Sequence, residues 1–316
     1  MMALAYLFAV LKNVVYGTTV FFTGALTEST DVLDVLALRF LMSFVVMWLL
    51  KTLGVVRISV GAKDFFVKNG RSGVMKNVLL TALFEPVLYM LFETLGISMT
   101  TNVTAGVILS LSAVSACIFE IVFLGENSTL WQKIFLGMGI FGAIYIAINT
   151  DTGTGENSVL GIVFVFLAVI TGSLFTVFSR KSSGSFSAME VTYVSCMLGA
   201  FAFNAANVVR HLARGDILHY FEPYFNAQNL LGFAVLAILS TIVATGMNNF
   251  ALSRMQPSTM AGFGGISTLV TIAVGVVWGG EHLERYHIIG LVFIVARMVG
   301  VSYIAIRRDR LAMKKT

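Results

Sequence analysis

Four polar residues recur at helical spacing inside an apolar stretch of the chain. They follow one another every four positions and share one face of a helix: Thr81, Glu85, Tyr89 and Glu93. A charge at the centre of a bilayer costs at least about 2.5–3.5 kcal/mol, so carboxylates there need a partner, a wet cavity or a function. We expect Glu85, Tyr89 and Glu93 to bind a solute or to couple its movement to another ion.

Glu85 is followed by Pro86, which removes a helical hydrogen bond and clashes with the preceding turn. Freed carbonyls beside a carboxylate are typical of the broken helices that form binding sites in carriers. The alternative is a packing kink, in which Glu85 is protonated and hydrogen-bonded inside the bundle.

A second polar stripe lies in the first apolar segment, at Lys12, Tyr16, Thr19 and Thr23. Lys12 falls several residues inside the end of this segment. A lysine there either extends its amine to the membrane surface or pairs with a glutamate of a neighbouring helix. We include Lys12 and Tyr16 in the predicted site and keep the first alternative open.

Hydroxyl and amide side chains line up in the second half of the chain, at Thr241, Thr245, Asn248 and Asn249. Such groups either bind a polar solute or hydrogen-bond neighbouring helices. We assign all four to the substrate-binding or coupling site, with helix bonding as the alternative.

Arg297, central in the last segment, needs an acidic or carbonyl partner and is expected to be structural. Arg39 lies close enough to the outer edge of its segment for either use.

The sequence contains no motif that indicates catalysis or metal binding. It has no HExxH, GxSxG, P-loop or CxxC pattern. Cys117 and Cys196 lie within apolar runs and are expected to be small buried side chains. We therefore predict no enzyme activity, no metal site and no cofactor. The competing interpretations are an integral-membrane enzyme, a channel and a membrane scaffold that transports nothing.

The composition is that of a membrane protein. Of 316 residues, 57% are hydrophobic and 12% are charged, and the mean hydropathy is +0.88, whereas soluble domains carry about 25% charged residues. The pI near 9.2 does not indicate nucleic-acid binding, because the basic excess lies in short loops beside apolar segments.

Ten apolar segments are long enough to cross a bilayer, which takes about 20 residues. They lie near 3–24, 33–55, 76–97, 103–124, 129–149, 158–179, 187–209, 229–251, 257–278 and 286–306. The polar run 149–158 is the expected junction between two halves. The first segment lacks a basic leader and a cleavage site, so we expect it to be retained.

Two of these segments repeat each other. Thr104–Glu126 returns as Met260–Glu281, and both begin with Ala-Gly and end on Gly-Glu. Duplicated halves of five spans each insert in opposite orientations, because five is an odd number. Inverted halves with a site between them are typical of transporters.

The basic residues of the loops are divided unevenly between the two sides of the membrane. One side holds only Arg210, Arg214 and Arg285. The other side holds Lys51, Arg57, Lys63, Lys68, Arg71, Lys76, Arg180, Lys181, Arg254, Arg307, Arg308, Arg310, Lys314 and Lys315. Since cytoplasmic loops carry the excess of Lys and Arg, both termini are expected in the cytoplasm.

The duplicated stretches Tyr89–Ile148 and Asn249–Ile306 resemble the EamA-type repeat of the drug/metabolite transporter superfamily. Further matches are Tyr16-Gly17, Arg39 and the segment Gly161–Lys181. The resemblance implies a ten-span secondary carrier with inverted repeats, often an exporter of amino acids, related metabolites or toxic compounds.

The sequence thus predicts an all-α integral membrane protein with ten transmembrane helices as two inverted five-helix repeats. The first repeat is 1–150, the second is 157–308, and 309–316 is a basic cytoplasmic tail. We predict a multi-pass carrier of the plasma membrane that exports small amphiphilic metabolites such as amino acids, or drugs, by alternating access. The cavity would be lined by spans 1, 3, 4, 6, 8 and 9.

Phosphates or nucleotide-sugars would require several basic residues at mid-depth, where only Lys12 and Arg297 are expected.

Protons and solute could compete for Glu85 and Glu93, which would drive export by proton entry; facilitated diffusion is the alternative. The identity of the substrate, the direction of transport and the formation of a homodimer stay open.

Overall fold

The computed structural model describes residues 2–60, 72–125, 129–149, 158–182, 185–255, 260, 262–280 and 282–313. The predicted junction between the halves and the middle of the loop 56–75 lie outside these ranges. Within them the chain is helical and has no strand. In the first half the helices are α1 (Met2–Ser29), α2 (Val32–Thr52), α4 (Ser72–Ala82), η1 (Leu83–Leu88), α5 (Tyr89–Ile97), α6 (Asn102–Leu109), α7 (Ser112–Leu124) and α8 (Leu130–Asn149).

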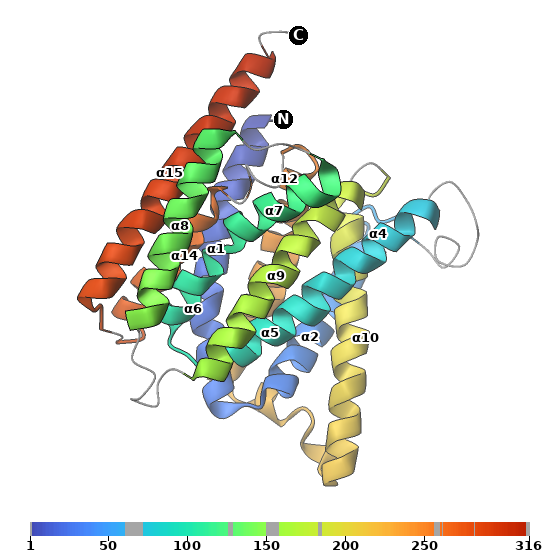
Figure 1. Ribbon diagram of the computed structural model, residues 1–316. Coiled ribbons are helices and arrows are strands. Elements are labelled where there is room, and N and C mark those ends of the chain that lie inside the picture. The colour runs from blue at the N-terminus through green and yellow to red at the C-terminus, as the bar shows by residue number, and fades with distance from the viewer. Residues whose placement is uncertain are drawn as a thin grey trace.

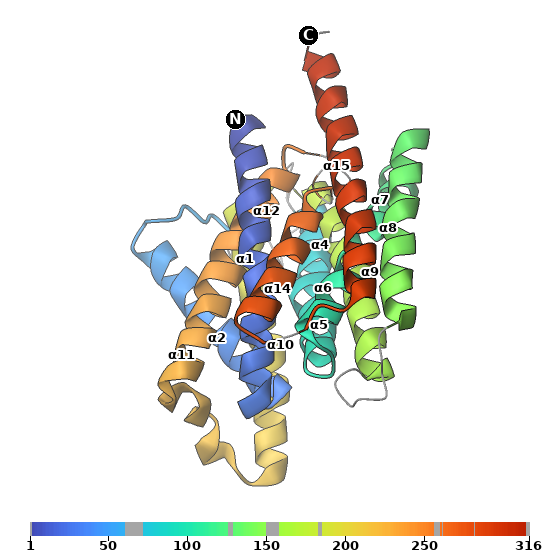
Figure 2. The same cartoon turned by 90° about the vertical axis from the view of Figure 1, so that its left-hand side faces the viewer.

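The second half follows the same pattern of long and interrupted helices. They are α9 (Val159–Ser182), α10 (Ala188–Arg214), η2 (Ile217–His219), η3 (Glu222–Phe225), α11 (Ala227–Ala234), η4 (Val235–Ala244), α12 (Thr245–Leu252), α14 (Gly264–Val277) and α15 (Arg285–Met313). Figures 1 and 2 show them as one bundle, with α8 beside α15 at one edge and both chain termini at the same end.

Eight helical segments of the described chain are long and apolar enough to cross a membrane. They correspond to the predicted spans 1, 2, 3, 4, 6, 7, 8 and 10, and some extend up to five residues beyond the predicted bounds, as Leu4–Ser29 and Ala188–Arg214 do. The apolar parts of α8 and α14, Lys133–Ile146 and Gly264–Val277, are shorter. The described residues therefore establish a multi-pass helical membrane protein.

Three of the spans are interrupted near their middle. η1 is a kink between α4 and α5, and η4 is a run of wide, π-type turns between α11 and α12. In η1, Glu85 leaves helical geometry, with φ −140° and ψ 114°, directly before Pro86. α6 and α7 are separated at Ser110 and Leu111. Such interruptions are frequent at functional sites, because they turn polar groups away from the regular helical pattern.

Small residues allow close packing where helices cross. A Cβ at Gly199 of α10 would lie 2.7 Å from Cγ of Pro86, so this glycine leaves the space into which the irregular turn of η1 packs. Gly17 of α1 has the same role against α14, where a Cβ would lie 2.6 Å from Cβ of Val270. These contacts join elements that are far apart in the sequence, as is usual for small residues in membrane helices.

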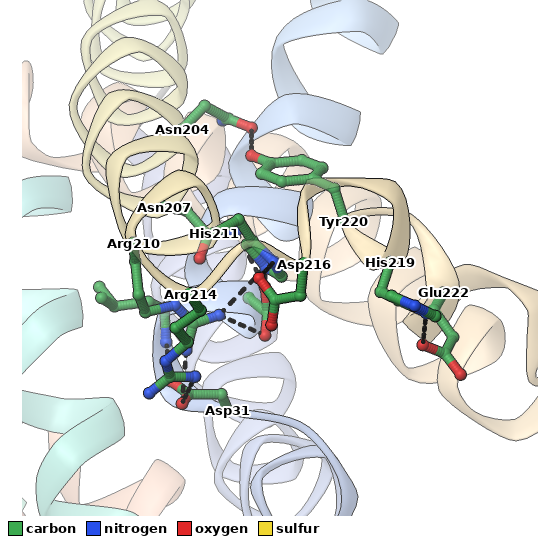
Figure 3. Close-up of polar contacts among 12 residues, drawn as sticks. Asp31, Asn204, Asn207, Arg210, His211, Arg214, Asp216, His219, Tyr220 and Glu222 are labelled. Atoms are coloured by element: carbon green, nitrogen blue, oxygen red, sulfur yellow. Dashed lines mark hydrogen bonds and ion pairs between the residues drawn. The ribbon is translucent and has the colours of Figure 1, made fainter.

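A polar cluster ties the first turn of α2 to the last turns of α10, at the end of the bundle opposite the termini (Figures 1 and 3). We call it the α2–α10 cluster; it consists of Asp31, Asp34, Asn207, Arg210, His211, Arg214 and Asp216.

Asp34 is its centre. One carboxylate oxygen accepts from Asn207 at 2.9 Å and faces Nε2 of His211 at 2.8 Å, while the other accepts from Arg210 at 2.5 Å. Arg210 also pairs with Asp31, the N-cap residue of α2, and Nδ1 of His211 faces Asp216 at 2.8 Å.

Tyr220 covers one side of this cluster. Its ring lies 5.2 Å from the ring of His211, and its hydroxyl donates to Asn204 of α10 at 2.5 Å. Burial raises the pKa of the Tyr220 hydroxyl, so the group stays protonated and keeps donating. The cluster and Tyr220 together hold α2 against α10 and fix the position of the residues that α2 carries.

We predict that Asp34→Asn lowers the free energy of unfolding by about 2–4 kcal/mol, because it removes the anion that three buried or half-buried donors share. The thiols of Cys117 and Cys196 are buried, so a thiol-reactive dye can follow thermal unfolding in detergent. The matched control is Glu222→Gln, which breaks the exposed His219–Glu222 pair and should change stability by less than about 0.5 kcal/mol. Equal melting temperatures for the two variants would contradict a stabilising role.

Candidate functional site

The interior of the bundle contains a cavity of about 130 Å³. A single water needs about 10–15 Å³ on the same measure, so there is room for a small solute. The lining residues come from α1, η1, α5, α6, α7, α9, α12 and α14. These elements are spans 1, 3, 4, 6, 8 and 9, the set that the sequence predicts. The cavity therefore lies between the two halves of the chain.

Both glutamates of the third span line this cavity, Glu85 from the kink η1 and Glu93 from α5. Glu93 accepts a hydrogen bond from the hydroxyl of Tyr89 at 2.5 Å. Gly172 of α9 leaves space for the Tyr89 ring, since a Cβ there would lie 2.8 Å from Cδ2. Glu85 is 8% exposed, and none of the hydrogen bonds or ion pairs found among the described residues uses its carboxylate. The carboxyl group of Glu85 therefore borders the cavity without a hydrogen-bond donor among the described residues.

Cations lie on two sides of these carboxylates. Lys12 of α1 lines the cavity, with Nζ 5.2 Å from the centre of the Tyr16 ring. Arg39 of α2 lines a second cavity of about 50 Å³, which Tyr16, Glu85, Tyr89 and Glu93 also line. The shared walls make the two cavities adjoining parts of one interior. Groups of both charge signs therefore surround a space that is large enough for a solute.

The polar residues of the eighth span have different positions. Asn248 lines the main cavity. Thr245 shares a hydrogen bond of 3.0 Å with the hydroxyl of Tyr16, and Thr241 accepts from Nε of Arg39 at 2.9 Å. Asn249 bonds Ser179 of α9 at 2.8 Å and Thr192 of α10 at 3.0 Å. In the described part of the chain Asn249 is not among the residues that line the cavities, so its contacts are those of helix bonding.

The two arginines inside the spans also differ in position, because one borders a cavity and the other does not. Arg39 reaches the interior cavity, although its position near a helix end left its use open. Arg297, which the sequence placed at mid-depth as an available cation, is 1% exposed and donates to the carbonyl of Ser110 at the break between α6 and α7. It is absent from the lining of the cavities in the described residues. Arg297 therefore stabilises the break between α6 and α7 and does not contact the space inside the cavity.

Several lining residues escaped the prediction. Asn13 is next to Lys12 and donates to the carbonyl of Ala9 at 2.6 Å, while Thr268 and Thr271 of α14 bond backbone carbonyls of α6 and α1. The repeated glycine segments gave a signal for α14, because Gly106 of α6 lies against Thr271. The hydroxyls of Thr268 and Thr271 do not belong to a regularly spaced row of polar residues. The sequence therefore does not distinguish them from ordinary helix-packing residues.

Apolar clusters lie along the helices on both sides of this interior. Towards the end opposite the termini, Val20, Ile97 and Ile272 belong to one buried cluster. A polar pocket of about 500 Å³, which includes Glu28, Asn102 and Trp278, lies beyond them. Towards the termini, Ala9, Leu252 and Met260 belong to another cluster. The charged cavity is thus set between two apolar layers.

Comparisons with known proteins agree with this architecture. The chain is 28% identical over 296 residues to the protein named "Uncharacterized transporter YcxC" of Bacillus subtilis (strain 168), covering 94% of this chain and 92% of that protein. A solved crystal structure matches 96% of this chain and 98% of its own, with a TM-score of 0.66 and 16% identity, which shows a shared fold.

A family model described as the EamA-like transporter family matches twice, over residues 3–148 and 159–303. Together with the relative named a transporter, this match indicates a membrane transporter and not an enzyme, with a lipid bilayer as its surroundings and a small molecule as its substrate. The chain belongs to the EamA-like transporter family.

Proposed function

We propose that this protein is a secondary carrier that exports small amphiphilic metabolites, such as amino acids, or drugs. It would have ten spans in two inverted halves, 1–150 and 157–308, and would work by alternating access at the plasma membrane. The observation that carries the proposal is the interior cavity between the two family matches, because carboxylates, cations, phenols and apolar side chains all line it. The export direction rests on the resemblance to exporters of this superfamily.

The chemistry of the cavity supports an amphiphilic solute. Glu85 and Lys12 offer opposite charges, and Tyr16 and Asn248 offer hydrogen bonds. Leu109, Val169 and Phe175 add apolar surface on the other walls. Binding sites of this kind fix a small molecule by a few polar groups and enclose its apolar part. A phosphate or nucleotide-sugar carries an excess of negative charge, and the two cations of this interior already have two carboxylates beside them, so that excess would stay uncompensated.

The proposed binding and coupling residues are Lys12, Tyr16, Glu85, Tyr89, Glu93, Thr241, Thr245, Asn248 and Asn249. Glu85 and Lys12 would contact the solute directly, since both face the main cavity. Thr241, Thr245 and Asn249 would act by holding Arg39, Tyr16 and the helices around the cavity. Association of two copies stays a prediction.

The orientation can be tested with single cysteines in a Cys117→Ala/Cys196→Ala background. Leu53, 74% exposed, directly follows α2, the second proposed span, and Leu218, 95% exposed, lies in η2 after α10, the seventh. Counted from a cytoplasmic N-terminus, residue 53 is therefore cytoplasmic and residue 218 is outside. With cytoplasmic termini, an impermeant maleimide added to intact cells should label Leu218→Cys at once and Leu53→Cys only after permeabilisation. The reverse pattern would place the termini outside.

The solute class can be tested by counterflow in proteoliposomes with amino acids, organic cations, triose phosphates and nucleotide-sugars. We expect exchange of compounds from the first two groups only, because the cavity holds as many carboxylates as cations. Glu85→Gln should reduce this exchange at least about tenfold for cationic compounds, while the exposed variant Glu222→Gln should leave it unchanged. Exchange of the phosphorylated compounds alone would overturn the proposed solute class.

The proposed coupling predicts that a pH gradient drives solute accumulation. A gradient of one pH unit is worth about 1.4 kcal/mol per proton, which allows up to about tenfold accumulation with one proton per solute. Glu85→Gln and Glu93→Gln should lower this ratio towards one, because an amide cannot release a proton, and Glu222→Gln is again the control. If wild type fails to accumulate solute, transport is facilitated diffusion. If both glutamine variants still accumulate it fully, Glu85 and Glu93 are helix-packing polar groups and do not carry the coupling.

A further inference from the structure

Arg39 is a buried cation whose hydrogen bonds among the described residues go to neutral groups. Its side chain is 2% exposed. Nε donates to Thr241 at 2.9 Å and Nη2 donates to Ser240 at 3.1 Å. Both partners are neutral hydroxyls, and the ion pairs found among the described residues do not include Arg39. A guanidinium keeps its charge in proteins, so removing it from water without an anion is costly.

The small cavity beside Arg39 has room for the missing anion. Its volume of about 50 Å³ is enough for about four waters, and a carboxylate group is smaller than that. Glu93 and Tyr89 also line this cavity, but Glu93 is bonded to the Tyr89 hydroxyl and makes no ion pair with Arg39 in the described structure. The cavity is therefore bordered by a guanidinium group that has two neutral hydrogen-bond partners and no anion within ion-pair distance among the described residues.

The adjoining main cavity supplies the complementary charge. Glu85 borders both cavities, and its carboxylate has no donor among the described residues. Counting Lys12, Arg39, Glu85 and Glu93 as charged, the interior carries two positive and two negative groups and is neutral. Adding a solute with a net charge would unbalance it in a medium of low dielectric constant, whereas a zwitterion would not.

We propose that Arg39 is the specificity-determining residue that binds the carboxylate of a zwitterionic solute, whose ammonium group binds Glu85. The planar guanidinium fork suits a carboxylate, because it can donate two parallel hydrogen bonds. Thr241 and Ser240 hold the guanidinium in place through its Nε and Nη2 atoms, and Ser240 also lines the small cavity. This inference rests on the proposed function and narrows it to solutes that carry both charges.

The test compares each amino acid with two analogues of similar size as inhibitors of its own counterflow. L-phenylalaninamide lacks the anionic charge and 3-phenylpropanoate lacks the cationic one; L-leucinamide and 4-methylpentanoate form a second set with L-leucine. In wild type both analogues should inhibit at least about tenfold more weakly than the parent amino acid. This comparison needs no variant, so it holds even if substitutions at Arg39 impair folding.

In Arg39→Gln, inhibition by the amino acid should fall to the level of its amide, while inhibition by the amide stays the same. Arg39→Lys keeps the charge but loses the fork and should lie in between. The inference is overturned if the amide inhibits wild type as well as the amino acid does, or if Arg39→Gln weakens both compounds equally. Exchange of organic cations without amino acids would overturn it too and leave the proposed function standing, whereas no exchange of any compound would overturn the proposed function itself.

Discussion

The cost of holding charge away from water governs how this protein is built. Lys12, Arg39, Glu85 and Glu93 come from three different spans, yet all four border one interior. Burying them singly would be prohibitive, whereas together their formal charges cancel and the enclosed space can hold water. The helices, their breaks and their glycines are arranged so that this group stays assembled without collapsing into direct ion pairs.

Irregular backbone occurs where a neighbouring helix supports it. Inside a membrane such backbone is tolerated only if it is buried in protein or lines a cavity. η1 meets both conditions, since Glu85 faces the cavity and Pro86 packs against Gly199 of α10. The break at Ser110 is supported from outside by Arg297, which binds its carbonyl. The peripheral helix α15 thereby contributes to the shape of a cavity that it does not line.

The sequence predicted which residues share a helix face better than it predicted which of them reach the interior. The spacing predicted one helix face for Glu85, Tyr89 and Glu93, and all three line the cavity, although Glu85 lies in a kink where the regular helical period is broken. Arg39 could not be placed in the same way, since its reach depends on how α2 packs against α10 and η4, and that depends on the α2–α10 cluster. Asn248 and Asn249 could not both face the interior, because adjacent helical residues point about 100° apart. Nothing in the sequence, however, distinguished which of the two would do so.

The wide turns of η4 decide which residues of the eighth span face the interior. A π-type turn holds one more residue than an ordinary turn, and the hydroxyls of Thr241 and Thr245 follow it by bonding carbonyls five residues back. If Val235–Ala244 closed into regular turns, α12 would be rotated about its own axis relative to α11. Asn248 would then leave the cavity that it lines, although no side chain had been exchanged. In this segment the hydrogen-bond register of the backbone therefore selects the side chains that border the cavity.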